Sequence, residues 1–476
     1  MIRSLPYERQ VLIVYIVAIF MTVIDGTMVN VALPTMADEF GVDSSDVEWI
    51  AVGYLLAVAT VIPAAGWLGD RFGTKRVFVW SLAMFTVVSL LCGAAQTLEQ
   101  LVIFRVLQGL GGGLMAPVGA AVLYRAYPLD RRASAATAVL SVAVVAPALG
   151  PLIGGILVDH ASWRWIFLIN LPIGAVGMLI AQSSMREETQ DEPGRLDLAG
   201  LLLSGGSVAL LLYTMSIGPD SGWASGRVLG LGALGLAAFV AAIVVELRVD
   251  EPMLFLRLFR DRLFRIINLS SSLIYAGFFG LIFVLPIYMQ SLRGFSAFES
   301  GLVQAPQAFG VFVVSNLVGK RAYQLIGPRR LMVVGTAFAS AITCAYALLD
   351  LGSPLRVVAG LSLLRGLSMG LVFVSIQTAV YATTSLADTG RATSLFNTQR
   401  QISYATGVAI AATVLAANVG DLGSGAPAAD RLAGHQYAFL AVGLIMIPGI
   451  VLSWFVRDDD VAETRGLEPA AAAVRS

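Results

Sequence analysis

The strongest constraint on this chain is a series of apolar segments, each about 20 residues long, that recurs along the whole sequence. A helix of about 20 residues rises about 30 Å, which matches the hydrocarbon core of a bilayer. No alternating strand pattern of the barrel type accompanies them, so we expect helices that satisfy their own backbone hydrogen bonds in lipid. The fourteen predicted segments are 11–33, 48–68, 77–96, 101–124, 134–158, 164–182, 198–217, 228–247, 266–289, 298–318, 330–349, 356–381, 396–417 and 436–456.

The composition leads to the same class of protein. Hydrophobic residues make up 57% of the chain and charged residues only 13%, whereas soluble domains carry about 25% charged residues. So few charges cannot cover the cores of a soluble protein, and a net charge of +0 gives no reason to expect a nucleic-acid partner. We therefore predict an all-α polytopic membrane protein that lies in a lipid bilayer. Segment 11–33 is long enough to be its first spanning helix rather than a cleaved signal peptide.

The distribution of Lys and Arg predicts the orientation. With a cytoplasmic N-terminus, most basic residues fall on inner connections and two fall inside helices, because cytoplasmic loops are enriched in Lys and Arg. Both termini are then cytoplasmic, and the tail at 458–476 is predicted to be disordered. Only five arginines fall on outer connections: Arg164, Arg227, Arg293, Arg356 and Arg431.

An internal repeat divides the chain. Predicted helices 1–6 are echoed by helices 9–14: Gly73-Thr-Lys-Arg matches Gly327-Pro-Arg-Arg, and Arg105 matches Arg365 on the corresponding helix. Transporters built from two such halves hold substrate near the midplane and alternate access between the two sides. The predicted units are a six-helix half at 1–185, an inserted helix pair at 186–250, a second six-helix half at 251–457 and the tail at 458–476.

Five sequence motifs in order carry a family resemblance: Ile24–Pro34, Gly66–Arg76, Leu101–Gly113, Gly150–Gly155 and Trp163–Pro172. On these motifs the whole chain resembles the fourteen-helix drug:proton antiporter branch of the major facilitator superfamily. The resemblance implies a monomer in the bacterial cytoplasmic membrane that exports lipophilic small molecules in exchange for protons. It implies no cofactor beyond the proton gradient. Because some relatives work with an adaptor protein, such a partner stays open here.

Asp25 is the candidate proton carrier, because it is the only carboxylate that we place deep in a membrane segment. Burial in lipid disfavours an ionised carboxylate and favours proton uptake. Arg105 is predicted to lie at a similar depth on the fourth helix. A pair with Asp25 that forms in only one conformation would couple proton uptake to transport. The alternatives are a static brace between helices, or a cap at a break near Gly26.

Two further groups are predicted to act in conformational change. The inner-loop motif supplies a gating loop that in the family braces the two halves in one state, although its charges could equally set topology alone: Gly66, Asp70, Arg71, Gly73, Lys75 and Arg76. Small residues of the fifth helix are taken as an antiporter hinge in the family, and close helix packing would explain them equally well: Gly150, Pro151, Gly154 and Gly155.

Polar and aromatic residues that could face a central cavity complete the predicted site: Asn30, Tyr54, Gln108, Met115, Tyr275, Phe279, Gln304, Gln307, Arg365 and Gln377. Arg365 could meet an anionic head group or only backbone carbonyls. With Asp25 as the single deep acid, neutral, monocationic or amphipathic substrates are favoured.

The sequence also limits the function class. The two histidines, His160 and His435, are expected on outer loops and offer no metal site. No phosphate-binding G-x-x-x-x-G-K-[ST] motif indicates ATP as the driver, and no nucleophile–base arrangement indicates an enzyme. Three alternatives remain beside drug export: a lipid or endogenous-metabolite exporter of the same fold, a symporting importer, and a sensor that does not transport.

Overall fold

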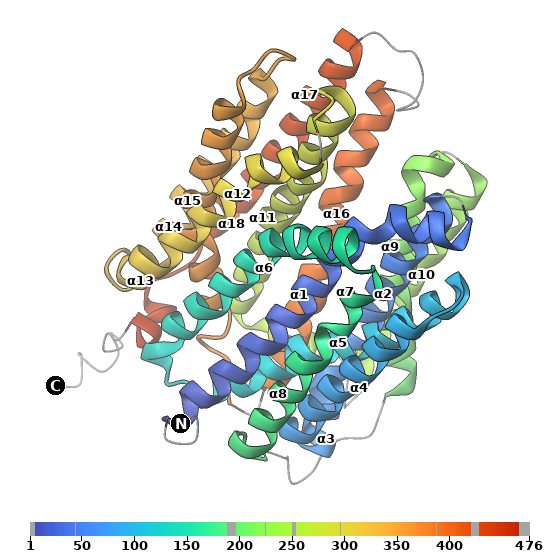
Figure 1. The fold of residues 1–476 in the computed structure, drawn as a ribbon. Helices are drawn as coiled ribbons and strands as arrows, with labels where there is room; N and C mark the ends of the chain where they lie inside the picture. Colours follow the sequence, from blue (N-terminus) through green and yellow to red (C-terminus); the bar gives the residue numbers. More distant parts are fainter. Residues whose placement is uncertain are drawn as a thin grey trace, which may run out of the picture.

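The structure is a computed structural model that describes residues 5–42, 44–187, 197–223, 225–249, 254–295, 297–386, 388–419 and 428–465. Throughout these ranges every regular element is helical (Figure 1). The first half contains α1 Tyr7–Phe40, α2 Ser44–Val61, α3 Ala65–Phe72, α4 Thr74–Ala94, α5 Leu98–Ala126, α6 Arg132–His160, α7 Arg164–Leu168 and α8 Asn170–Ser184. The pair α9 Leu198–Ser221 and α10 Gly226–Arg248 follows.

The second half begins after the link that follows α10. Its elements are α11 Arg262–Ile287, α12 Ala297–Val314, α13 Lys320–Ile326, α14 Pro328–Ala345, α15 Leu355–Ala379, α16 Thr389–Val419, α17 Ala428–Leu444 and α18 Met446–Trp454. Several spans are interrupted where proline or glycine occurs. At Pro63, for example, a 3-10 turn separates α2 from α3, because proline lacks the N–H that would continue the helical ladder.

Twelve helices in the described part of the chain are long and apolar enough to cross a membrane. The two other predicted segments, 134–158 and 396–417, lie inside α6 and α16, which contain 29 and 31 residues. Each predicted segment thus coincides with helix, and the prediction of an all-helical polytopic membrane fold is confirmed. The number of fourteen crossings stays a prediction.

The two halves pack separately and then against each other. Within the first half α1 packs on α6, and α2 and α4 pack on α5; within the second, α12 and α14 pack on α15 while α11 packs on α16. The halves meet where α6 contacts α12 and α15, and where α3 and α5 contact α16. This interface is the place that the repeat predicts for substrate.

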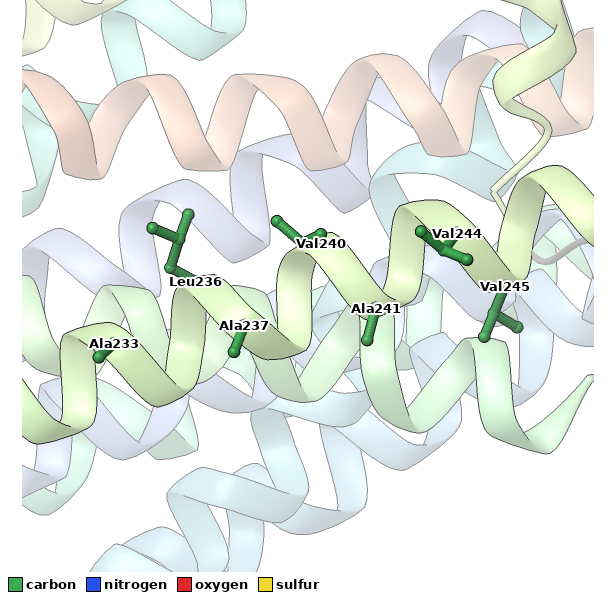
Figure 2. A pocket seen from close by; sticks show the side chains of 7 residues that line it. All are labelled: Ala233, Leu236, Ala237, Val240, Ala241, Val244 and Val245. Atoms are coloured by element: carbon green, nitrogen blue, oxygen red, sulfur yellow. The ribbon is translucent and has the colours of Figure 1, made fainter.

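The inserted pair lies at the side of this arrangement (Figure 1). Helix α9 packs against α2 and α16, whereas α10 packs mainly on α9. In the most apolar 18-residue window of α10 only 17% is buried, against 72% in that of α5. Figure 2 shows the resulting outer surface of α10, where a shallow groove is lined only by alanine, valine and leucine side chains. Such a surface faces lipid and has no polar group that could orient a ligand.

We name the face that carries the N-terminus and the basic links the inner face. Polar contacts between the halves gather near it. Ser394 Oγ donates to the carbonyl of Ile62 at 2.6 Å, and Thr393 Oγ1 donates to that of Pro117 at 3.0 Å. Asn316 Nδ2 donates to Ser141 Oγ at 2.5 Å. The structure is therefore closed at its inner face.

Two assignments differ from the sequence analysis. Residues 458–465, which the sequence assigned to a disordered tail, form two 3-10 turns under the inner face, and Thr464 is buried beside the Tyr323 hydroxyl at 2.7 Å. Residues 466–476 lie outside the described residues. His435, expected on an outer loop, lies in α17 and is fully buried. The tail segment is ordered by packing against α13, whereas α17 begins several residues before the predicted segment 436–456 and so includes His435.

Candidate functional site

Asp25 and Arg105 meet in the interior of the first half. Asp25 on α1 is 0% exposed and Arg105 on α5 is 1% exposed, and Asp25 Oδ2 lies 2.6 Å from Arg105 Nη1. Such a short, charge-assisted contact is of the strong kind. The pair that the sequence suggested is therefore present in the inner-closed conformation, and solvent does not reach the carboxylate there.

The second oxygen of Asp25 is also satisfied. Oδ1 accepts hydrogen bonds from Asn170 Nδ2 at 2.8 Å and from Gln108 Nε2 at 3.2 Å. Both amides also donate to Ser89 Oγ, at 3.1 and 3.2 Å, and Ser89 donates in turn to the carbonyl of Phe167. Helices α1, α4, α5 and α8 thus supply a network in which every hydrogen bond to the Asp25 oxygens is donated by a neighbouring side chain.

Arg105 is held from its other sides. Its Nε donates to the carbonyl of Ile50 at 3.2 Å, and its Nη1 donates to Gln108 Oε1 at 2.6 Å. Its guanidinium lies 4.2 Å from the ring centre of Tyr54, a cation–π contact. If Asp25 gains a proton, the attraction to Arg105 is lost while these neutral contacts remain. Protonation of Asp25 would therefore weaken the contact that holds α1 against α5.

Sequence reasoning missed two residues of this network, Asn170 and Ser89. Asn170 lies in the motif Trp163–Pro172, which supported the family resemblance but was given no role. Since α8 begins at Asn170, the residue could be read from sequence only as a helix start. Ser89 had no sequence signal at all, because a serine on an apolar helix is common in membrane proteins.

The second half contains a related site around Arg365, which is 0% exposed. Arg365 Nη1 donates to Gln307 Oε1 at 2.7 Å, and its Nε donates to Thr343 Oγ1 at 3.0 Å. Its Nη2 donates to the carbonyls of Gly277 and Phe278. The sequence left two partners open for Arg365, an anionic head group or backbone carbonyls. These neutral acceptors match the second. In the described part of the chain Arg365 forms no ion pair.

The predicted gating loop divides into two parts. Asp70 is 5% exposed and faces two arginines: its Oδ1 lies 3.7 Å from Arg125 Nη2, and its Oδ2 lies 3.8 Å from Arg391 Nε on α16 of the other half. A Cβ added at Gly66 would lie 3.3 Å from the Arg391 backbone, so glycine allows α3 to approach α16. These two residues contact the second half.

The remaining loop residues bind within their own half. Gly73 has a φ of 93° at the break between α3 and α4. The carboxylate of Glu187 accepts from the backbone N–H of Lys75 at 3.2 Å and lies 3.5 Å from Arg76 Nε. Arg71 is exposed and makes no polar contact within the described ranges. The loop therefore connects the halves through Asp70 and Gly66 rather than through its basic residues.

The predicted hinge in α6 packs directly on α1 beside Asp25. A Cβ at Gly150 would clash with the side chain of Thr27, and one at Gly154 would lie 3.2 Å from Met28 Cα. Nothing lies within 4 Å of the corresponding point at Gly155, and the side chain of Pro151 lies outside the described residues. Close helix packing thus explains Gly150 and Gly154.

The predicted cavity residues fall into different groups. Tyr54 and Gln108 join the Asp25 network, and Gln307 joins Arg365. Three members pack in the apolar interior: Met115, Tyr275 and, partly buried, Phe279. The remaining three predicted residues join neither polar network. Asn30 is exposed, whereas Gln304 and Gln377 are half-buried.

The fold and these contacts can now be compared with known proteins. The family model described as Major Facilitator Superfamily matches residues 15–408. The chain belongs to the Major Facilitator Superfamily. The family resemblance predicted from five motifs is thereby confirmed, and the protein is a multi-pass membrane transporter.

Curated relatives of this superfamily member are named as drug transporters. It is 34% identical over 408 residues, 86% of this chain and 75% of the relative, to the multidrug transporter protein MdtP of Bacillus subtilis. It is 35% identical over 443 residues, 91% of this chain and 92% of the relative, to the putative multidrug resistance protein MdtD of Klebsiella pneumoniae. Among solved structures, the human organic anion transporter MFSD10 (TETRAN) matches with a TM-score of 0.69, covering 94% of this chain and 100% of that one. At 16% identity this match shows the fold alone.

Proposed function

We propose that this superfamily member exports hydrophobic or amphipathic small molecules in exchange for protons, with Asp25 as the proton carrier. The observation that carries the proposal is the buried pair of Asp25 and Arg105, joined at 2.6 Å in the conformation that is closed at the inner face. The curated relatives named as multidrug transporters support the substrate class. The proposed location is the bacterial cytoplasmic membrane, with the basic links and both termini in the cytoplasm. The proposed working form is a monomer that needs no cofactor.

The proposed exchange follows because a proton and the guanidinium of Arg105 compete for the carboxylate of Asp25. In the inner-closed conformation Asp25 pairs with Arg105. Proton uptake, once solvent reaches the site, removes the charge that Arg105 binds and frees α1 to move against α5. Because Gly150 and Gly154 of α6 pack on α1 next to Asp25, such a movement is transmitted to the helix that contacts the second half. Proton release at the inner side and substrate release at the outer side complete the cycle.

The test measures proton movement in proteoliposomes on addition of lipophilic cations, neutral drugs or lysolipids. We expect the wild-type protein to move protons with at least one member of the panel. Asp25→Asn should abolish this movement while the substrate still binds. Asp38→Asn, which changes an exposed carboxylate on the same helix, is the matched control and should behave as wild type. Equal proton movement by wild type and Asp25→Asn would show that Asp25 is structural.

A further inference from the structure

The side-chain amide of Asn170 is only half satisfied, and it lies against the proposed proton carrier. Asn170 is 0% exposed at the start of α8, and its Nδ2 donates to Asp25 Oδ1 at 2.8 Å and to Ser89 Oγ at 3.1 Å. Its Oδ1 is buried and accepts no hydrogen bond from the described residues. A buried acceptor without a donor is disfavoured, which leaves this atom ready to accept a hydrogen bond.

Capping of α8 does not account for Asn170. An asparagine at a helix start ordinarily uses its side-chain oxygen to accept a hydrogen bond from a backbone N–H of the first turn. At the start of α8 no side chain makes such a cap, and Asn170 Oδ1 accepts nothing within the described ranges. The amide instead directs its NH2 group at α1 and α4. Asn170 therefore serves the polar network and not the helix start.

The two amides beside Asp25 differ in how their orientation is fixed. Gln108 Oε1 accepts from Arg105 Nη1 at 2.6 Å and from Cys92 Sγ at 3.6 Å. If the Gln108 amide turned over, its NH2 group would face the guanidinium, and two donors cannot bond to each other. In the described part of the chain no donor holds Asn170 Oδ1 in this way. Of the two amides, only that of Asn170 can turn without breaking a bond to a cation.

A proton on Asp25 calls for such a turn. Every hydrogen bond to the Asp25 oxygens is donated by a neighbour, so the O–H of a protonated carboxyl faces donors only. Ser89 Oγ already accepts from both amides and donates to the carbonyl of Phe167. A half-turn of the Asn170 amide exchanges its Oδ1 and Nδ2. It thus places an acceptor where Nδ2 now lies, 2.8 Å from Asp25 Oδ1.

We propose that Asn170 is the positioning residue of the proton site and holds Asp25 in both of its charge states. Its NH2 group donates to the carboxylate, and after the half-turn its Oδ1 accepts from the protonated carboxyl. The proton arrives from water on Asp25 Oδ1, and the amide exchanges the bonds that Nδ2 donates for the one that Oδ1 accepts. The proposal rests on the proposed proton coupling and adds to it a residue that distinguishes the two charge states.

This arrangement gives the helices around Asp25 different roles. Arg105 holds α1 against α5 through a contact that weakens when Asp25 gains a proton. Asn170 holds α1 against α8 in either charge state. Helix α1 packs on both α5 and α8, so proton uptake loosens α1 from α5 and leaves it attached to α8. A movement of α1 would therefore carry α8 with it.

The test is infrared difference spectroscopy on the full chain in zwitterionic nanodiscs, with the alkaline spectrum subtracted from the acidic one. An amide carbonyl absorbs at lower wavenumber when its oxygen accepts a hydrogen bond, so proton uptake should shift the side-chain band of Asn170 downward. Both Asn170→Leu and Asp25→Asn should lose this signal. A residue that only packs against Asp25 would not produce it.

The signal is separable from the other groups that titrate. Arg105, Tyr54 and Cys92 are the other titratable groups of the network, and none of them has an amide carbonyl in its side chain. Asn268→Leu is the matched control and should keep the signal. Asn268 is 1% exposed and its Oδ1 also lacks a partner among the described residues, but its Nδ2 donates to the carbonyl of Phe264 on its own helix.

A transport assay measures the consequence in proteoliposomes. Asn170→Leu should lower the maximal rate of proton exchange about 10-fold, as the loss of one buried hydrogen bond allows, at an unchanged half-saturating substrate concentration. Asn170→Thr should restore part of the rate, because a hydroxyl both donates and accepts. Asn268→Leu should exchange protons as wild type does.

Two outcomes would overturn the proposal. A difference signal that persists in Asn170→Leu assigns it to another residue, and an exchange rate unchanged in Asn170→Leu assigns Asn170 to packing alone. If Asn170→Leu fails to fold, isotope-labelled asparagine marks the band in wild type, and a band that stays fixed as the pH falls contradicts the proposal.

The same experiments distinguish this proposal from the proposed function. Proton exchange that requires Asp25 while the Asn170 band stays fixed contradicts the role of Asn170 only. An Asn170 band that shifts with the pH and is lost in Asp25→Asn supports that role. If Asp25→Asn nevertheless moves protons as wild type does, the proton-coupling proposal alone is contradicted.

Discussion

The two halves of this transporter contain the same kind of buried arginine site, and only one of them contains an acid. In both, an arginine on the fourth helix of the half is buried beside an aromatic ring and hydrogen-bonded to a glutamine and to backbone carbonyls. Where the first half places the carboxylate of Asp25 on its first helix, the second half offers the carbonyls of Gly277 and Phe278 on α11.

This difference bears on the proposed proton coupling, because only the first of these two arginine sites places a carboxylate beside its arginine. The contacts of Arg365 are neutral at any ordinary pH, so its surroundings keep the same charge through a transport cycle. Arg105 faces a group whose charge can be removed. We infer that the first half carries the coupling, whereas Arg365 mainly fixes the packing of α11, α14 and α15.

The largest expected effect tests the difference between the Arg105 and Arg365 sites directly. Arg105→Met leaves Asp25 buried without its cation and should lower the free energy of unfolding by about 3–5 kcal/mol. Arg365→Met leaves only neutral acceptors without a donor and should lower it less, by about 1–3 kcal/mol. Chemical unfolding of the purified protein in detergent measures both changes. The double variant Asp25→Asn, Arg105→Met should recover part of the first loss; no recovery would mean that Arg105 acts by packing and not by charge.

A smaller effect should be equal in the two halves. Gly73 and Gly327 have φ angles of 93° and 86°, and a Cβ at either position would meet a carboxylate, that of Glu187 or that of Asp458. Alanine at each position should therefore lower the free energy of unfolding by about 1–3 kcal/mol because of backbone strain. Gly206→Ala in α9 is the control, since nothing lies within 4 Å of its added Cβ. Clearly unequal losses at Gly73 and Gly327 would contradict the repeat at this turn.

The smallest effect concerns the outer end of the first half. Glu39 accepts from Arg164 Nη1 at 2.7 Å and from Trp163 Nε1 at 2.6 Å. The Arg164 hydrogen bond lowers the pKa of Glu39 below its ordinary value of 4.5. A lowered folded-state pKa adds stability that is present above the unfolded pKa and is lost as the pH falls through the folded value.

The gain from this pair should be less than about 1 kcal/mol, because solvent screens an exposed pair. Unfolding of wild type and Glu39→Gln, compared at pH 7 and below about pH 4.5, should show a difference that shrinks at the lower pH. A difference that is independent of pH would assign the effect to the neutral hydrogen bond with Trp163. At the outer end of the second half, Tyr288 and Arg293 donate to the backbone carbonyls of Asp350 and Ser353.

Particular residues show how far the sequence could lead toward the site. Asp25 and Arg105 could be predicted as neighbours, because an isolated charge in a long apolar segment is rare and the rise of a helix places both at similar depth. Asn170 and Ser89 could not be predicted, since neutral polar residues cause no conflict in a helix and gain a role only from a partner on another helix.

By itself the sequence determined the all-helical polytopic class and the family, because hydrophobic length and motif order are properties of a linear chain. Only the tertiary structure decided which helices meet and which faces they turn to one another. The rotation of each helix about its own axis placed three hydrogen-bond donors around Asp25. It placed neutral acceptors around Arg365. It also brought Arg132 of α6 to the backbone carbonyl of Tyr381, which follows α15. The physical reason is that the hydrophobic effect fixes the depth of a helix in lipid, whereas the partners of its buried polar groups depend on side-chain packing between helices distant in the chain.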